Sequence, residues 1–192
     1  NRGNFKGNEA LEAEKSASIT VNNQSLWSQF SLQNSLYFQD VDNTIVAIFN
    51  ARGIGRYENV SAARIWGLST NGRYRFGPSL TVSATMDLMD TNTESTYIAF
   101  DNKHLPGVYH KQFQLQLDYD INERWQLSIT QHLDQDLYFD RANKISSTSQ
   151  FNTERNTTHL SIAWQLKQYA AHFSINNLFD RAYYDLANRP AE

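Results

Sequence analysis

The chain of 192 residues carries 17 Lys and Arg against 20 Asp and Glu, so its net charge of −3 offers no basic stripe for nucleic acid. It contains no cysteine, which excludes disulfides and thiolate-bound metals. No apolar run approaches the roughly 20 residues of a membrane-spanning helix, but β-barrels escape this test because only alternate residues of their strands face lipid.

Polar and apolar residues alternate through most of the chain, and no helical period of any length occurs. In residues 80–88, the cleanest example, Leu, Val, Ala, Met and Leu alternate with Thr, Ser, Thr and Asp. A period of two is that of a strand whose two faces meet different surroundings. The pattern predicts eight antiparallel strands, at about residues 9–21, 26–48, 57–76, 80–88, 108–119, 125–134, 159–166 and 169–177.

Short and long connections alternate along the predicted strands. Tight turns are predicted near residues 22, 77, 121 and 167, the first at Asn22–Ser25, and longer connections near 53, 97 and 147. The segment Asp40–Asn43 contains neither Gly nor Pro, so we expect one strand to continue through it, with a hairpin turn as the alternative. Outer-membrane barrels keep short turns periplasmic and long loops extracellular. Eight strands then leave both chain ends outside the cell, and we expect a further strand beyond each end.

Three features favour a transmembrane barrel over a soluble β-sandwich, which is the alternative from pattern alone. The polar faces are rich in uncharged Gln, Ser, Thr, Asn and His, where a soluble surface would carry more Lys and Glu. The nine residues 80–88 come close to the roughly 9–11 that cross a bilayer at a tilt. Aromatic residues mark the strand ends at the tight turns, as in an interfacial girdle: Tyr74, Phe76, Tyr119, Trp125 and Tyr169.

The apolar positions of these strands are therefore predicted to face lipid. They are Leu80, Val82, Ala84, Met86, Leu88, Phe113, Leu115, Leu117, Leu127, Ile129, Leu160, Ile162, Phe173 and Ile175. The strands at about 14–21 and 169–177 would be unpaired edges, and open edges recruit partners. An isolated fragment of this kind is expected to pair edge to edge with another chain.

Four segments resemble one family, the TonB-dependent outer-membrane receptors. The most specific is Asn177-Leu178-Phe179-Asp180-Arg181-Ala182-Tyr183, which resembles the signature of the penultimate strand. Leu11–Ser16, Tyr57–Leu68 and Leu105–Val108 follow the family's order and spacing, although Ala13 stands where the family usually has Pro. The resemblance implies an all-β chain, an antiparallel segment of about eight strands from a larger barrel of about 22. Residues 1–192 would be its C-terminal portion, without the N-terminal plug and the final strand.

The family resemblance also implies the function. It implies active uptake of a scarce nutrient across the outer membrane of a Gram-negative cell, above all a ferric siderophore, with cobalamin, haem or a glycan as alternatives. Energy would come from TonB through the missing plug, and the other partners would be outer-membrane lipid, lipopolysaccharide and a metal-chelate ligand. No catalytic constellation and no close pair of histidines appears in the sequence, so neither an enzyme, a resident cofactor nor a metal site is predicted.

In this family, ligands bind on the extracellular side, near the upper barrel wall. Arg offers charge and a rigid donor fork and Tyr a flat face with a hydroxyl, which suit a large anionic chelate. The candidate ligand-binding residues are Arg52, Arg56, Tyr57, His104, Arg141, Arg181 and Tyr184. An interfacial aromatic belt with loop arginines that face lipopolysaccharide is the alternative interpretation of these side chains.

Overall fold

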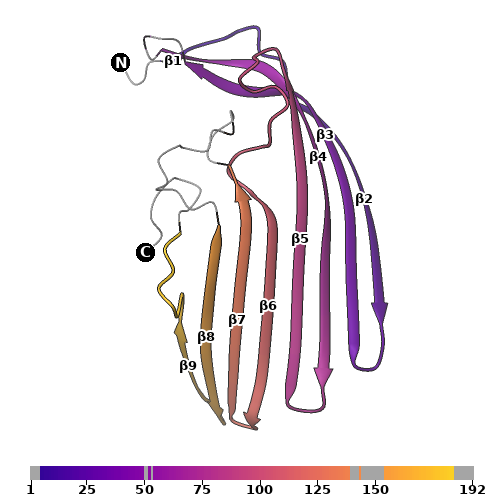
Figure 1. Ribbon diagram of the computed structural model, residues 1–192, viewed down its shortest axis with the longest axis vertical. Coiled ribbons are helices and arrows are strands. Elements are labelled where there is room, and N and C mark those ends of the chain that lie inside the picture. Colours follow the sequence, from indigo (N-terminus) through magenta and orange to yellow (C-terminus); the bar gives the residue numbers. More distant parts are fainter. Residues whose placement is uncertain (1–4, 50–51, 53, 139–142, 144–153, 184–192) are drawn as a thin grey trace.

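A computed structural model describes residues 5–49, 52, 54–138, 143 and 154–183, which form one nine-stranded sheet. Eight strands follow one another from β2 to β9, each hydrogen-bonded to the next, and they lie side by side in a curved sheet (Figure 1). No helix in this described part is long and apolar enough to cross a membrane. The strands are β1 (Phe5–Lys6), β2 (Lys15–Leu26), β3 (Phe30–Phe49), β4 (Gly55–Phe76), β5 (Leu80–Ser95), β6 (Tyr109–Asn122), β7 (Trp125–Leu137), β8 (Arg155–Leu166) and β9 (Tyr169–Ile175).

The eight predicted antiparallel strands are confirmed in number, order and direction. The short strand β1 was not predicted. It pairs in parallel with the start of β4, with Phe5 opposite Gly55 and Lys6 opposite Arg56. Two residues carry too little pattern to show a period, so only their position beside β4 reveals them.

Tight turns join the strands at one end of the sheet, as predicted, but the first lies elsewhere. The predicted turn at Asn22–Ser25 is wrong, because β2 continues to Leu26 and the chain turns at residues 27–29. Trp27 N donates to Phe30 O at 2.8 Å and closes this turn. Asn and Ser are favoured in turns, but here they lie in the ladder opposite residues of β3, Asn23 opposite Asn34.

At the other end β4, β5, β7 and β8 are longer than predicted, whereas β2 begins at Lys15 and not near residue 9, and β9 ends at Ile175. β3 continues through Asp40–Asn43 as one strand, with register shifts between Val41 and Ile45 and a positive φ of 59° at Asn43. β4 begins at Gly55, two residues before its predicted start, so Arg56 lies in a strand and not in the predicted loop. β5 extends to Ser95, seven residues beyond its predicted end at Leu88. The longer connection predicted near residue 147 lies mostly outside the described residues.

The register places the predicted lipid-facing residues on one face, which we call the apolar face. Val82 pairs with Leu117, Leu117 with Ile129, Ile129 with Leu160, and Leu160 with Ile175. Directly opposite residues project to the same side of a sheet, so these five share a face. The opposite face, which we call the polar face, carries Gln116, Ser128 and Ser161 in the intervening rows. Lipid contact on the apolar face remains a prediction.

The apolar face is open in this chain. Phe173 is 63% exposed and Leu115 is 46% exposed, whereas the buried hydrophobic side chains of the described part are Val46, Ala63 and Leu137. The sheet thus has no packed core beneath its apolar face. At its two ends, β2 and β9 each have one neighbouring strand among the described residues, where the edges were predicted.

Candidate functional site

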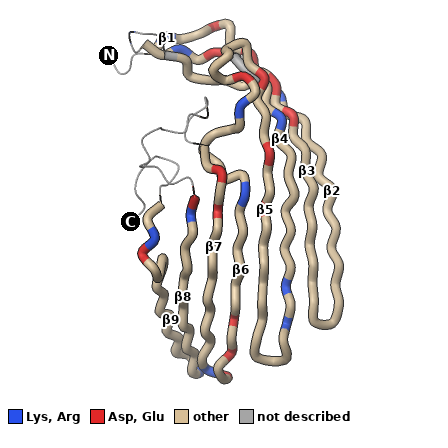
Figure 2. Tube along the Cα trace, viewed as in Figure 1, with Lys and Arg blue, Asp and Glu red and all other residues tan. Residues whose placement is uncertain are grey.

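Charged residues are concentrated away from the middle of the sheet. Figure 2 shows them gathered at the end opposite the tight turns, with smaller groups on β4 and β6 near the turns. The lower half of β3 carries none between Phe30 and Gln39. The charged groups that could bind a ligand therefore lie mainly at the strand ends opposite the tight turns, which we call the upper ends, and in the segments that connect them.

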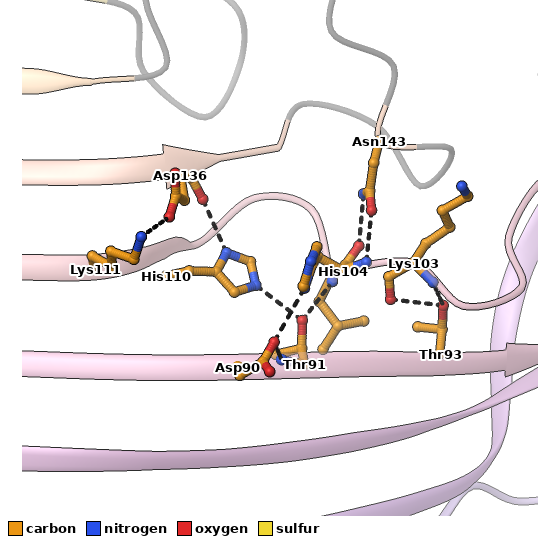
Figure 3. A network of polar contacts seen from close by, with 10 residues as sticks. Asp90, Thr91, Thr93, Lys103, His104, His110, Lys111, Asp136 and Asn143 are labelled. Carbon is orange, nitrogen blue, oxygen red and sulfur yellow. Dashed lines mark hydrogen bonds and ion pairs between the residues drawn. The ribbon is translucent and has the colours of Figure 1, made fainter.

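A histidine cluster occupies the upper ends of β5 and β6 (Figure 3). Nε2 of His110 lies 2.9 Å from Oγ1 of Thr91, and its Nδ1 lies 3.0 Å from the carbonyl oxygen of Asp136. Leu105 N donates to Oγ1 of Thr91 at 2.8 Å, so the hydroxyl is free to donate to His110. With Nδ1–H donating to the carbonyl of Asp136, Nε2 can accept from the Thr91 hydroxyl, and the ring is buried, with 4% of the residue's surface exposed.

Aromatic contacts extend this cluster toward the surface. The ring of His104 stacks on Tyr138 with centroids 4.9 Å apart and meets His110 edge-on at 5.1 Å. Burial raises the pKa of the Tyr138 hydroxyl, and the carboxylate of Asp136 raises it further. Nδ1 of His104 lies 3.3 Å from Asp90 but is too poorly aligned for a hydrogen bond. His104 and Tyr138 thus present a stacked pair of rings at the top of β5 and β6.

The backbone geometry around the cluster explains why these residues meet. Asp136 adopts a positive φ of 59° in β7, which turns its carbonyl toward His110. Asn143 clamps the segment before β6, because it accepts from His104 N at 2.6 Å and donates to His104 O at 2.8 Å. The backbone of His104 is therefore held by the side chain of Asn143.

A charged pair lies beside this cluster on β7 and β8. Nε of Arg155 donates to Oδ2 of Asp134 at 2.6 Å, and Asp134 is 1% exposed. The guanidinium also lies over the rings of Tyr109 and Tyr183, at 5.5 and 5.9 Å from their centroids. A cation between two aromatic faces is held in place by the ring quadrupoles as well as by its carboxylate. His132 and His159 stand edge-to-face on the same two strands, 5.2 Å apart.

A third group of charged and aromatic contacts lies around the β3–β4 hairpin, farther from the tight turns than the histidine cluster. Nε of Arg56 donates to Glu58 at 2.7 Å, and the hydroxyl of Tyr97 donates to the other oxygen of Glu58 at 2.9 Å. The bond from Arg56, followed by that from Tyr97, holds the pKa of Glu58 below its usual range. The hydrogen bond to Glu58 raises the pKa of the Tyr97 hydroxyl. Tyr57 stacks on Phe5 of β1 at 5.2 Å.

The structure divides the predicted ligand-binding residues among separate places. Arg56 and Tyr57 belong to the outer β3–β4 group, and His104 belongs to the histidine cluster. Arg52 is exposed near the tip of the same hairpin, and Arg181 is exposed after β9, where its backbone pairs with Asn177. The other two, Arg141 and Tyr184, lie outside the described residues.

Sequence reasoning missed the residues that organise the upper polar surface. Thr91 was placed in a loop, and His110 and Arg155 were not singled out. His110 falls at a polar position of its strand, but its contacts with Thr91 and Asp136 depend on register and on the positive φ at Asp136, and the neighbours of Arg155 are themselves polar, so no alternation marked it. Among the described residues, no group of three or more His, Asp or Glu side chains could hold a metal ion.

Comparison with known proteins gives the chain a family context. A family model described as TonB dependent receptor-like, beta-barrel matches residues 1–178. No curated protein sequence matches. Similar solved structures include the ferric yersiniabactin uptake receptor FyuA from Yersinia pestis, which is 17% identical with a TM-score of 0.72 over 89% of this chain and 26% of that one.

Two further structures have the same architecture. The copper transporter OprC is 17% identical with a TM-score of 0.76 over 94% of this chain and 27% of that one. The ferric citrate transporter FecA is 14% identical with a TM-score of 0.74, over 89% of this chain and 27% of that one. At this identity the likeness shows the fold, and the chain spans about a quarter of the length of these structures.

Proposed function

Because the chain belongs to the TonB-dependent receptor-like β-barrel family, we propose that it forms part of the barrel wall and extracellular surface of a ferric siderophore receptor. The receptor would lie in the outer membrane of a Gram-negative cell and draw energy through TonB. Since the chain spans about a quarter of the solved structures, the plug, the remaining strands and the contact with TonB would belong to a longer protein.

The arrangement of side chains around Arg155 is the observation that supports a ferric siderophore as the substrate. Its guanidinium is ordered by Asp134 and lies over Tyr109 and Tyr183, while His104 and Tyr138 present stacked rings nearby at the strand ends. An ordered cation framed by aromatic faces suits an anionic chelate with flat catecholate or hydroxamate groups. Several proteins of similar structure are named for such cargo: the ferric yersiniabactin uptake receptor FyuA and the siderophore receptors PirA and PiuA.

The predicted ligand contacts remain part of this proposal. Arg52, Arg56, Tyr57, His104 and Arg181 would meet the chelate from the extracellular side, together with Arg141 and Tyr184. Arg56 is bound to Glu58, so a ligand that takes its guanidinium must displace that carboxylate. Replacement of Arg52 and Arg56 by alanine should weaken binding by about tenfold or more, which is about 1.4 kcal/mol or more.

Transport assays on the full-length receptor test the proposal. Cells that express it as their sole siderophore receptor should accumulate radiolabelled iron from an anionic chelate, and loss of TonB should abolish the uptake. Binding of the iron-loaded chelate should fall in the Arg52→Ala, Arg56→Ala double variant while its outer-membrane level stays unchanged. Arg75→Ala, at the tight-turn end, is the control. Uptake of cobalamin, haem or copper with no uptake of iron chelates would overturn the assignment of substrate.

A further inference from the structure

Polar side chains interrupt the apolar face in the middle of β3 and β4. On β3 this face runs from Phe30 to Phe38 in alternate residues, and its central member is Asn34. The register sets Asn34 opposite Thr70 on β4 and opposite Asn23 on β2. Three neighbouring strands thus present a polar row in a face whose alternate residues are mostly apolar and are predicted to contact acyl chains.

The hydrogen bonds within the row leave its strongest donors unused. Thr70 Oγ1 donates to Oδ1 of Asn34 at 3.0 Å, and Ser25 Oγ donates to Oδ1 of Asn23 at 3.3 Å. Both carboxamide oxygens therefore accept, and the NH₂ groups of Asn23 and Asn34 have no partner among the described residues. Acyl chains offer no acceptor, and an unpaired donor in hydrocarbon is costly. The two NH₂ groups would therefore be satisfied by a binding partner that places hydrogen-bond acceptors against the row, within the membrane.

A hollow of about 510 Å³ adjoins the row on the side of β5 and β6. Thr70 belongs to its lining, and the small residues Gly72 and Ala84 leave it shallow. A Cβ built on Gly72 would meet its nearest atoms only at 3.8 Å, so there is space above this residue. Larger apolar side chains surround it: Leu32, Met86, Phe113, Leu115 and Leu133. Between membrane helices, small residues let backbones approach closely, and the space over Gly72 and Ala84 would allow a facing sheet the same close approach.

We propose that this surface is a two-fold interface between two copies of the receptor, with the axis close to Asn34. A carboxamide is both donor and acceptor, so two Asn34 side chains related by a two-fold axis can satisfy each other. The row also has projecting apolar neighbours, Val21 at 61% exposure and Leu36 at 57%, that suit the hollow of the facing copy. The inference rests on the proposal that the apolar face meets lipid, and it goes beyond uptake, which it does not require.

Cross-linking in intact outer membranes tests the interface. The chain has no cysteine, so one cysteine at Leu36 in a cysteine-free receptor gives a single reporter beside the axis. A short bis-maleimide should join two receptors through this position. Phe173→Cys is the matched control, because Phe173 is 63% exposed on the same face but lies on β9, six strands from β3, and should give no dimer. Mass spectrometry of the product identifies both partners.

The Asn34→Leu variant distinguishes a specific two-fold interface from chance encounters between receptors in a crowded membrane. In the Leu36→Cys background it should lower the cross-linked dimer by about fivefold or more, since association loses its polar contacts. Receptor level and iron uptake should not change, so a failed dimer is distinguishable from a failed transport assignment. Absence of the dimer, a product that contains another protein, or a dimer that Asn34→Leu leaves intact would each overturn the proposal.

Discussion

Replacement of Gly67 by alanine should destabilise the sheet through one local contact. Gly67 lies on the polar face of β4 directly opposite Tyr37 on β3. A Cβ at this position would lie 2.4 Å from the Tyr37 hydroxyl oxygen, 2.5 Å from its Cζ and 2.6 Å from the carbonyl oxygen of Leu88. The tyrosine ring can swing aside, but the Leu88 oxygen belongs to the backbone of β5, so the strand itself must shift.

The expected cost follows from these distances. Overpacking of a tightly fitted site typically lowers the free energy of unfolding by about 1–3 kcal/mol. Alanine also restricts the unfolded chain more than glycine does, but this stabilises the fold by only about 0.4–1 kcal/mol. Gly72→Ala on the same strand is the matched control. Its new Cβ would meet Leu32 and Phe30 at 3.8 Å, an ordinary contact, so it should be neutral or stabilise by up to about 1 kcal/mol.

Denaturant unfolding of the full-length receptor in lipid vesicles, followed by tryptophan fluorescence, measures both variants. Tyr37→Ala in the Gly67→Ala background should recover part of the loss, because the contact with Leu88 remains. Equal stabilities for Gly67→Ala and Gly72→Ala would refute the reasoning, since the two differ in what their new methyl group meets.

Three other predictions concern the face of the sheet, the buried pair and the outer hairpin. Ala84→Arg should cost about 2–4 kcal/mol in the same unfolding assay if the site lies near the bilayer midplane, whereas Ser83→Arg on the polar face should cost far less. Asp134→Ala should cost about 2–3 kcal/mol, somewhat below the loss of a fully buried pair because the Arg155 side chain stays 32% exposed, and Asp134→Asn should cost less. Glu58→Gln should lower the pKa of Tyr97 toward 10.0 in an NMR titration of tyrosine. Because folding lowers the pKa of Glu58, its contact with Arg56 should hold above pH 4.5 and fail as the pH falls through the lowered value.

Much of the fold could be predicted because its signal is local. A period of two in residues 80–88 reports two different faces without any knowledge of the partner strand, and the family resemblance agrees with the family model that matches residues 1–178. The family assignment is thereby confirmed, and with it the antiparallel barrel architecture. Members of this family are transporters and not enzymes, in agreement with the absence of a catalytic constellation from the sequence.

The errors arose where partner strands decide the outcome. Asn22 and Asn23 have turn propensity, but pairing with β3 outweighs it, so β2 continues to Leu26. Strand β1 exists only because β4 offers it an edge at Gly55. The upper polar surface was likewise hidden, because the contact between His110 and Thr91 needs both the register of β5 with β6 and the turned carbonyl of Asp136.

Spin labels on neighbouring residues test most directly whether this chain is barrel wall. Single cysteines at Leu115, Leu127, Gln116 and Ser128 place nitroxides on the two faces of β6 and β7 in the full-length receptor. Labels at Leu115 and Leu127 should relax strongly with oxygen, which dissolves in lipid, and weakly with a water-soluble nickel complex, whereas those at Gln116 and Ser128 should meet water. Strong relaxation by nickel at Leu115 and Leu127 would contradict the assignment of the apolar face to lipid.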